Sequence, residues 1–402
     1  MGGRPRTEQR VLGATRDGAL TAIRHHSKST TSTIEDWVEP ATNQTRLLYA
    51  CPNVETAYDL VRVNVGSPTF RECYESAAQR FGWSRRNLAP RSTRDGRWPV
   101  GWGMATATYP ARRAPAAAIA RMTPDGRAFV RAGTQEIGCG TYTSMTQIAA
   151  DALGIASDQV RFELGNTDMP ENPASTGSVT AASTGSAVRD VATALRQKLI
   201  DIAVGDPRSP LHGAVPAAVQ ATNGRLTSGT LGESYSELLA RQGDKSVEVT
   251  IASRPGAETR EYSMHSFGAV VDPDLGIVRV PRIVTAHAVG TILNAKTARS
   301  QIHGGVVWGV GMALEEETLI DPRTGRYINA DLAEYHVPVS ADIGEIDVAF
   351  IEQPDMHVST VGAKGVGEIG ITGVAASIAN AVFHATGKRV RELPIRIERV
   401  LA

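Results

Sequence analysis

Residues 360–370 read TVGAKGVGEIG, in which Glu368 is the one carboxylate among four glycines. Apolar residues from Val374 to Val382 follow at helical spacing, so we expect a helix that ends near Gly387. A carboxylate in such a turn, if surrounded by an apolar pocket, has a raised pKa and can act as a general base. The alternative, which the local sequence favours when taken alone, is a carboxylate that stabilises the N-terminus of the helix.

Two other stretches of small residues also precede predicted helices. Residues 133–140 (GTQEIGCG) run into a helical pattern that stops at Gly154, and residues 172–186 run into a helix with Val188 and Leu195 on one face. Loops of this kind expose backbone N–H groups, which bind anions and phosphate in particular. One such loop is weak evidence, because glycine also serves tight turns. Three of them suggest a large polar ligand held by backbone and hydroxyl groups.

The remaining pattern intermixes strands, helices and hairpins. We expect a helix over residues 71–81, extended segments that include 47–50 and 60–65, and hairpin turns at residues 17–18, 124–126, 272–276 and 321–325. This order favours an α+β fold with mixed or antiparallel sheets and packed helices over a doubly wound parallel sheet.

Composition argues against several classes of protein. Lys+Arg and Asp+Glu both number 42, and this neutral balance predicts neither nucleic acid nor a membrane as a partner. Cys51, Cys73 and Cys139 form no Cys-x-x-Cys pair, so we expect no zinc or iron–sulfur site in this chain. P-loop, dinucleotide-binding, serine-hydrolase and His-x-x-x-His motifs are absent. No signal peptide or membrane-spanning run is recognised, and a cytoplasmic protein is expected.

The stretch 360–370 resembles the Lys-x-Val-Gly-Glu motif of molybdenum hydroxylases, the xanthine dehydrogenase/aldehyde oxidase family. The chain as a whole is similar to the C-terminal part of their large, molybdenum-cofactor-binding subunit, most of all in bacterial three-subunit aldehyde oxidoreductases. The resemblance implies that Glu368 is the catalytic base beside molybdenum. It also implies oxidative hydroxylation of aldehydes or N-heterocycles such as xanthine, and a molybdenum–molybdopterin cofactor in its cytosine dinucleotide form.

The same resemblance implies which residues contact this cofactor. Residues 133–153 resemble a pterin-contacting loop and helix, residues 173–180 a loop whose hydroxyls bind phosphate or pyrophosphate, and residues 300–305 a segment with a cofactor-binding glutamine. The implied contact residues are Gly138, Cys139, Gly140, Thr141, Ser175, Ser178, Thr180, Gln301, Lys364, Gly365, Val366 and Gly367. No side chain is expected to ligate the metal.

Three departures from the family pattern affect these expectations. Cys139 stands where many relatives have glutamine, and both a contact to pterin or molybdenum and a role as a small filler remain open. The family's Gly-Gly-x-Phe-Gly-Gly-Lys loop is not found, and an internal block is expected to be absent after Phe70. We therefore interpret residues 1–115 as a shortened remnant of a first molybdopterin-binding domain with its connector, and residues 116–402 as the second such domain. Losses of this kind leave polar groups of a buried cofactor unmet.

The leading hypothesis is an oxidoreductase subunit, which acts on a small-molecule substrate and passes electrons to 2Fe-2S and FAD cofactors on partner subunits. A separate polypeptide that carries the N-terminal part of the large subunit is a further expected partner. The alternative hypothesis is a truncated, non-catalytic remnant or one half of a split large subunit. A generic nucleotide-binding protein is a weaker third hypothesis, because no standard phosphate motif is present. Export to the periplasm with a signal-bearing partner is the alternative to a cytoplasmic location.

Overall fold

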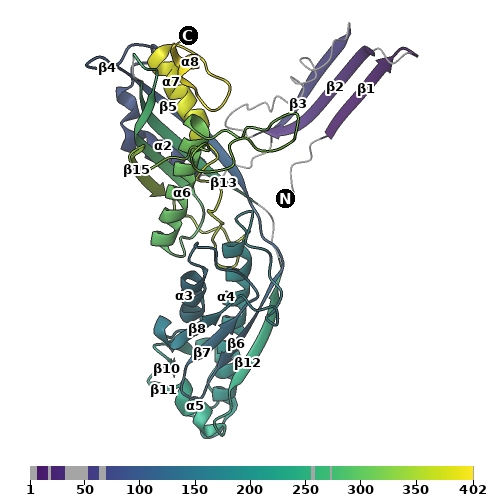
Figure 1. Cartoon of the computed structure of the whole chain (residues 1–402). Coiled ribbons are helices and arrows are strands. Elements are labelled where there is room, and N and C mark those ends of the chain that lie inside the picture. Colours follow the sequence, from purple (N-terminus) through teal and green to yellow (C-terminus); the bar gives the residue numbers. More distant parts are fainter. Residues whose placement is uncertain are drawn as a thin grey trace. The chain divides into compact units, whose positions relative to one another are not determined.

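The structure is a computed structural model that describes residues 7–16, 20–31, 53–62, 69–254, 259–271 and 274–401. It divides into two compact units, Met1–Phe70 and Arg71–Ala402, and each is described by itself (Figure 1). In the first unit, β1 (Thr7–Ala14) pairs antiparallel with β2 (Leu20–Thr31), and β2 pairs parallel with β3 (Val54–Arg62). The predicted turn at 17–18 and the predicted extended residues 47–50 and 63–65 lie outside the described residues.

The second unit contains a five-stranded sheet in the order β15-β14-β13-β5-β4. Its strands are β4 (Arg94–Asp95), β5 (Trp98–Ala111), β13 (Thr259–Val271), β14 (Val278–Ala288) and β15 (Ile343–Phe350). The β14–β15 pair is parallel and the other pairs are antiparallel. The helices around the sheet are α2 (Thr69–Phe81), α6 (Ala295–Leu314) and α7 (Val374–Thr386).

Strand β5 explains why these helices cover opposite faces of the sheet. Its residues alternate between the two faces, and Gly101 and Gly103 both lie under α7. A Cβ atom added at Gly101 would lie 1.8 Å from the carbonyl oxygen of Ala381, so only glycine allows the helix to approach this closely. Trp102 faces the other way and meets Phe81 of α2 edge-on, with ring centroids 5.2 Å apart.

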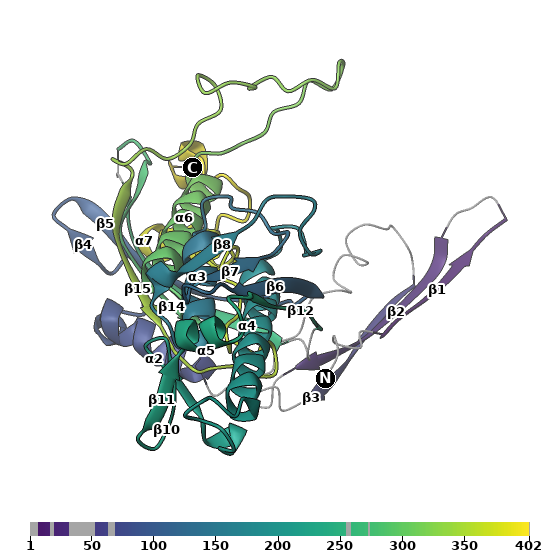
Figure 2. The ribbon, with the colours of Figure 1, turned by 90° about the horizontal axis from the view of Figure 1, so that it is seen from below.

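A second lobe is inserted between β5 and β13, and we call residues 116–253 the inserted lobe. Its four-stranded sheet has the order β12-β6-β7-β8. Helices α3 and α4 pack on this sheet, and α4 runs beside β6 and β12 (Figure 2). The elements are β6 (Ala116–Met122), β7 (Ala128–Arg131), α3 (Thr141–Leu153), β8 (Val160–Glu163), α4 (Thr180–Gly205) and β12 (Val247–Ser253).

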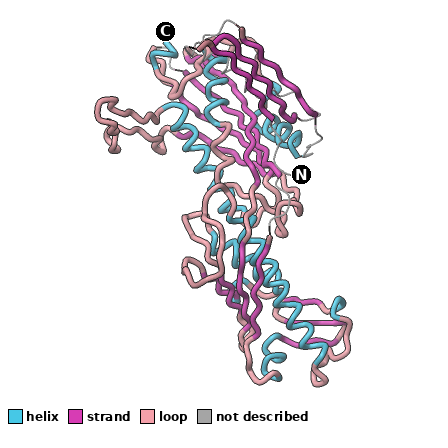
Figure 3. The backbone as a smooth tube through the Cα atoms, turned by 90° about the vertical axis from the view of Figure 1, so that its right-hand side faces the viewer, coloured by secondary structure: helices cyan, strands magenta, loops and turns pink. Residues whose placement is uncertain are grey.

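The other residues of the second unit form the large-sheet lobe. Its chain leaves the sheet after Ala111 and returns at Thr259, which pairs with Ala111 directly. Each lobe buries its own hydrophobic core, and loops gather where the lobes meet (Figure 3). The remaining short elements are η1 (Trp83–Arg85), η2 (Ser157–Gln159), η3 (Pro216–Ala218), β9 (Gln220–Thr222), β10 (Arg225–Ser228), β11 (Leu231–Ser234), α5 (Tyr235–Arg241) and α8 (Ile397–Leu401).

The predicted α+β class is confirmed, with mixed and antiparallel sheets and packed helices. The helix expected over 71–81, the β6–β7 hairpin and the helix ends at Gly154 and Gly387 are confirmed as well. The turn expected at 321–325 carries only one isolated bridge, Ile320 to Tyr327, within a loop of residues 315–342 that projects beyond α6 (Figure 2). The predicted turn itself is confirmed, because the Gly325 N–H donates to the Asp321 carbonyl and the Ile328 N–H donates to the Leu319 carbonyl, both at 2.8 Å, although the described residues beside it form no strand.

The compact-unit boundary differs from the predicted domain boundary at residue 116. Strand β5 precedes residue 116, yet it pairs with β13 along almost its whole length, so it belongs to the large-sheet lobe. The division at Phe70 and Arg71 falls where the internal block was expected to be absent. The assignment of residues 1–115 and 116–402 to two domains stays a prediction. Among the described residues, no helix has the length and apolar character needed to cross a bilayer.

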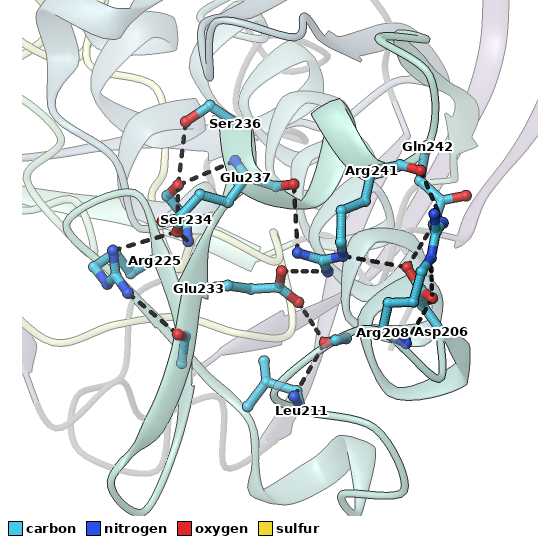
Figure 4. A network of polar contacts seen from close by, with 12 residues as sticks. Asp206, Arg208, Leu211, Arg225, Glu233, Ser234, Ser236, Glu237, Arg241 and Gln242 are labelled. Carbon is cyan, nitrogen blue, oxygen red and sulfur yellow. Dashed lines mark hydrogen bonds and ion pairs between the residues drawn. The ribbon is translucent and has the colours of Figure 1, made fainter.

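A buried ionic network fastens α5 inside the inserted lobe (Figure 4). The Glu233 side chain is 3% exposed and forms an ion pair with Arg241, while Ser209 Oγ donates to Glu233 Oε1 over 2.5 Å. Arg241 Nε also donates to Asp206 Oδ2 at 3.3 Å. Removing one partner of such a pair leaves a buried charge uncompensated, which costs far more than the loss of an exposed pair.

We expect Arg241→Met to lower the free energy of unfolding by roughly 3–5 kcal/mol, because the buried Glu233 carboxylate loses its ion-pair partner. The matched control is Arg225→Met, whose ion pair with Glu237 is half exposed on both sides. It should leave the denaturation midpoint nearly unchanged. Urea unfolding of the three proteins measures both effects, and equal midpoints for the two variants would contradict the buried-network interpretation.

Candidate functional site

A cavity of about 300 Å³ lies where the inserted lobe meets the large-sheet lobe. Four segments line it: residues 137–145 and 175–181 from the inserted lobe, and residues 289–308 and 363–368 from the large-sheet lobe. The first two segments lead into α3 and α4, and the third leads from β14 into α6. The cavity therefore unites stretches that are more than 200 residues apart in the chain.

Most of the residues predicted to contact a cofactor line this cavity. They are Cys139, Thr141, Ser175, Ser178, Thr180, Gln301, Lys364, Gly365, Val366 and Gly367, together with the predicted base Glu368. Gly138 and Gly140 do not line it. The three small-residue stretches were expected to meet at one ligand, and the structure brings parts of all three to one cavity.

The amides of Gly138 and Gly140 already have a partner within the protein. Both N–H groups donate to Glu136 Oε1, at 2.8 and 3.1 Å, and the N–H of Tyr142 donates to Glu136 Oε2 at 3.3 Å. Burial acts to raise the pKa of Glu136, but these backbone donors outweigh it and hold the pKa below its usual value. The Glu136 carboxylate thus binds the backbone N–H groups that were expected to bind an anionic ligand.

The turn that carries Glu368 rests on the segment before α4. Ser178 Oγ accepts a hydrogen bond from the N–H of Glu368 at 3.0 Å, and a Cβ atom added at Gly365 would lie 1.7 Å from the carbonyl oxygen of Ser178. Ser178 itself has a left-handed backbone with φ of 57°. Two backbones therefore meet with no room for a side chain between them, which requires glycine at position 365.

Glu368 lines the cavity, and one of its carboxylate oxygens is buried. Its Oε2 atom is buried and has no hydrogen-bond partner among the described residues. Burial raises the pKa of Glu368, and the N–H of Gly177, the hydroxyl of Tyr109 and the charge of Arg112 oppose that shift without cancelling it.

The alternative of a helix-stabilising carboxylate is wrong. Helix α7 begins at Val374, six residues beyond Glu368, and its N-cap is Gly373. A dipole contribution fades within the first turn of a helix, so Glu368 gains little from α7. What remains is a carboxylate of raised pKa on a residue that lines a cavity, which suits a general base.

Lys364 brings a buried positive charge to the same wall. Its side chain is 6% exposed, and its Nζ atom lies 3.4 Å from Asp355 Oδ2. The N–H of Lys364 donates to the carbonyl of Val289 at 2.9 Å, which fastens the turn to the end of β14. The ion pair offsets the cost of burying the Lys364 charge, and Lys364 also lines the cavity.

Sequence reasoning missed several polar residues that hold the cavity walls together. Gln135 Oε1 accepts the N–H of Ser175 at 2.9 Å and joins the first loop to the second. Asn294 caps α6 by accepting the N–H of Thr297 at 3.0 Å, and its amide donates to Gln147 of α3 at 3.1 Å. An Asn directly before a helical run is a usable N-cap signal, whereas the Gln135 contact has no local signal.

The donor set fits a large polar cofactor with phosphate groups. The residues that line one cavity include Thr141, Ser175, Thr180, Gln301 and Lys364, which carry hydroxyl, amide and ammonium groups. The buried Glu368 Oε2 supplies an acceptor that lacks a protein donor. The Cys139 thiol also lies on the wall, with Sγ 3.2 Å from Thr141 Oγ1. Within the described ranges, no three His, Cys, Asp or Glu side chains group so as to hold a metal ion.

Comparisons with known proteins identify the family of the chain. Residues 76–344 match the family of the molybdopterin cofactor-binding domain. The chain is 33% identical to the aldehyde oxidoreductase molybdenum-binding subunit PaoC of Escherichia coli O157:H7, over 99% of this chain and 61% of that protein. It is 32% identical to the xanthine dehydrogenase molybdenum-binding subunit of the same organism, over 82% of this chain and 45% of that protein.

The fold is also similar to that of a solved structure, quinoline 2-oxidoreductase from Pseudomonas putida 86, with a TM-score of 0.76 at 18% identity. That likeness covers 98% of this chain and 61% of that one. The chain belongs to the molybdenum-cofactor-binding subunits of the xanthine dehydrogenase/aldehyde oxidase family. It spans less than two thirds of the length of these relatives.

We expect Gly365→Ala to destabilise the second unit and to disturb the cavity, because its Cβ would overlap the Ser178 carbonyl, which is backbone and has no rotamer to change. The matched control is Gly304→Ala on the exposed side of α6, where a Cβ would meet nothing within 4 Å. Alanine there should raise stability by up to about 1 kcal/mol. Thermal unfolding distinguishes the two, and an unchanged midpoint for Gly365→Ala would contradict the close approach.

Proposed function

We propose that this chain is the cofactor-binding part of a molybdenum hydroxylase that carries out oxidative hydroxylation of aldehydes or N-heterocycles. The observation that carries the proposal is the buried, unpartnered Oε2 of Glu368, at a cavity that also gathers the hydroxyl, amide and ammonium groups of the other segments. Membership of the family supports the proposed hydroxylase function. The comparisons do not favour the alternative of a non-catalytic remnant.

Each residue then has a distinct role. Glu368 takes a proton at Oε2 from the attacking oxygen, and burial favours this step because it raises the proton affinity of the carboxylate. Ser175, Thr180 and Lys364 hold the phosphate end of the cofactor, while Gln301 hydrogen-bonds its pterin. When bound, a molybdenum–molybdopterin cofactor would supply the activation of an oxygen nucleophile and an acceptor for two electrons. The net reaction adds one oxygen atom from water to the substrate carbon and releases two electrons and two protons.

The proposal also covers the form of the cofactor, the electron-transfer partners and the cellular location. The cofactor is the cytosine dinucleotide form, and the two electrons leave through 2Fe-2S and FAD cofactors on partner subunits in the cytoplasm. The printed names of relatives as molybdenum-binding subunits, and the lack of a Cys-x-x-Cys pair in this chain, support separate electron-transfer partners.

The test is to co-express the chain with its genomic neighbours, purify the complex and measure molybdenum and pterin. Stoichiometric molybdenum with a pterin dinucleotide, and oxidation of an aldehyde or an N-heterocycle with an artificial electron acceptor, are expected. A complex that contains neither molybdenum nor pterin would refute the proposal.

Glu368→Gln should keep the cofactor content and lower kcat by a factor on the order of 10² to 10⁴, because an amide cannot accept the proton. In the unaltered enzyme, the rate should fall on acidification at a pH above the usual Glu value of about 4.3, since protonation removes the base and burial raises its pKa. Steady-state kinetics from pH 4 to 9 measure both effects. The control is Glu352→Gln, an exposed carboxylate on a neighbouring loop, which should change neither quantity.

The rate of chemical modification of Cys139 reports whether the cavity is occupied, and this measurement does not require enzyme activity. Iodoacetamide should modify Cys139 in cofactor-free protein and should modify it several-fold more slowly once the cavity is filled. Cys73 is an internal control, because burial raises its pKa to about 12 and keeps its thiol protonated and unreactive. Peptide mass spectrometry follows both sites, and equal Cys139 rates in loaded and cofactor-free protein would place the cofactor elsewhere.

A further inference from the structure

Ser178 has an unusual backbone for its position in the chain. Four non-glycine residues of the described part have positive φ, namely Arg91, Ser178, Asn223 and Asp244. The other three are exposed, whereas Ser178 is half buried and lines the cavity. A serine in the left-handed region is strained, and it persists only where the surrounding structure enforces it. Such residues cluster at functional sites, so the contacts enforced at Ser178 are informative.

The strained backbone directs two polar atoms of Ser178 at the turn that carries Glu368. Its hydroxyl oxygen accepts the Glu368 N–H at 3.0 Å, and its carbonyl fills the space that a side chain at Gly365 would need. A Cβ atom at Gly367 would lie 3.2 Å from the same hydroxyl oxygen. Ser178 therefore touches three of the five residues from Lys364 to Glu368, although it lies 190 residues away from Glu368 in the chain.

We propose that Ser178 is a positioning residue for Glu368, which fixes the direction of the base by holding its backbone N–H. This inference rests on the proposed function of Glu368. It differs from the role that the sequence resemblance implied for Ser178, namely a hydroxyl that binds the phosphate of the cofactor.

The physical need for such a residue follows from the glycines. We call residues 364–368 the base turn. Gly365 and Gly367 lie within it and allow its backbone many conformations, so the turn alone cannot fix the direction of the Glu368 side chain. A misplacement of about 1 Å can lower a rate by as much as 10²-fold. A hydrogen bond from the segment before α4 restrains the Glu368 backbone directly, and so supplies the rigidity that the turn lacks.

The neighbouring hydroxyls make a useful contrast. Ser175 Oγ lies within hydrogen-bonding distance of the Gln135 carbonyl and of Thr180 Oγ1, both at 3.3 Å. Neither Ser175 nor Thr180 has a hydrogen bond to the base turn among those seen in the described residues. Loss of the Thr180 hydroxyl should therefore weaken cofactor retention, whereas loss of the Ser178 hydroxyl should act through Glu368.

The test uses Ser178→Ala and Ser178→Gly in the co-expressed complex, with Thr180→Ala for comparison. Alanine removes the acceptor and keeps the backbone strain, while glycine removes the acceptor and relieves the strain, so at least one variant should fold. Both should keep unaltered molybdenum and pterin content and show a kcat lower by roughly 10- to 100-fold with little change in KM. Ser157→Ala, at an exposed serine, should behave like the unaltered enzyme.

A double-mutant cycle decides whether Ser178 acts through Glu368. In the Glu368→Gln background, Ser178→Ala should cause no further loss of kcat, because the base that it positions is already gone. Multiplied losses in the double variant would overturn the proposal. Loss of molybdenum and pterin from both Ser178 variants would also overturn it and return Ser178 to the role of a cofactor ligand.

Amide hydrogen exchange tests the contact itself without any turnover. Peptides that contain the Glu368 amide should exchange faster in Ser178→Ala than in the unaltered protein, because the N–H loses its acceptor. Unchanged exchange would overturn the positioning role. If the unaltered complex contains no cofactor, or if Glu368→Gln retains full activity, the proposed function fails, and the exchange result still reports separately on the contact.

Discussion

The structure of the site depends on one close approach between two backbones. Residues at the start of α4 and residues of the glycine turn at 365–367 come so near that no side chain fits between them. This contact joins the inserted lobe to the large-sheet lobe at the cavity itself. Because it is made by backbone atoms, it tolerates almost no change in volume, and it fixes where Glu368 stands relative to the loops that precede α3 and α4.

Close approaches of two backbones at a glycine also occur elsewhere in the large-sheet lobe. Glycines of β5 let α7 lie directly on the sheet, and Gly305 of α6 lies against the backbone of Gly370. Close packing of this kind leaves little freedom to the segments between β14 and α7, which carry Lys364 and Glu368. A base on a glycine turn would otherwise be mobile, so the rigidity of the site comes from the elements around the turn.

Glu368 differs from three other charged residues of the second unit, namely Glu136, Glu233 and Lys364. The carboxylates of Glu136 and Glu233 and the ammonium of Lys364 all have partners that offset the cost of burial. Glu368 keeps a buried oxygen without a partner and a raised pKa. Unpaired buried groups are costly, and they persist where function requires them. This contrast, together with family membership, leads from the geometry to the proposed hydroxylase chemistry.

Local sequence determined much of this protein. The spacing of apolar residues placed α3 and α7, and Gly154 and Gly387 marked their ends. The motif at residues 364–368 indicated the family and singled out Glu368 as the proposed base. Only the tertiary structure decided that Glu136 takes the amides of the first loop, that Ser178 holds the N–H of Glu368, and that β5 pairs with β13 across the inserted lobe. The reason is physical: periodicity reports which face of one element is buried, whereas a hydrogen bond between distant segments leaves no periodic trace in either of them.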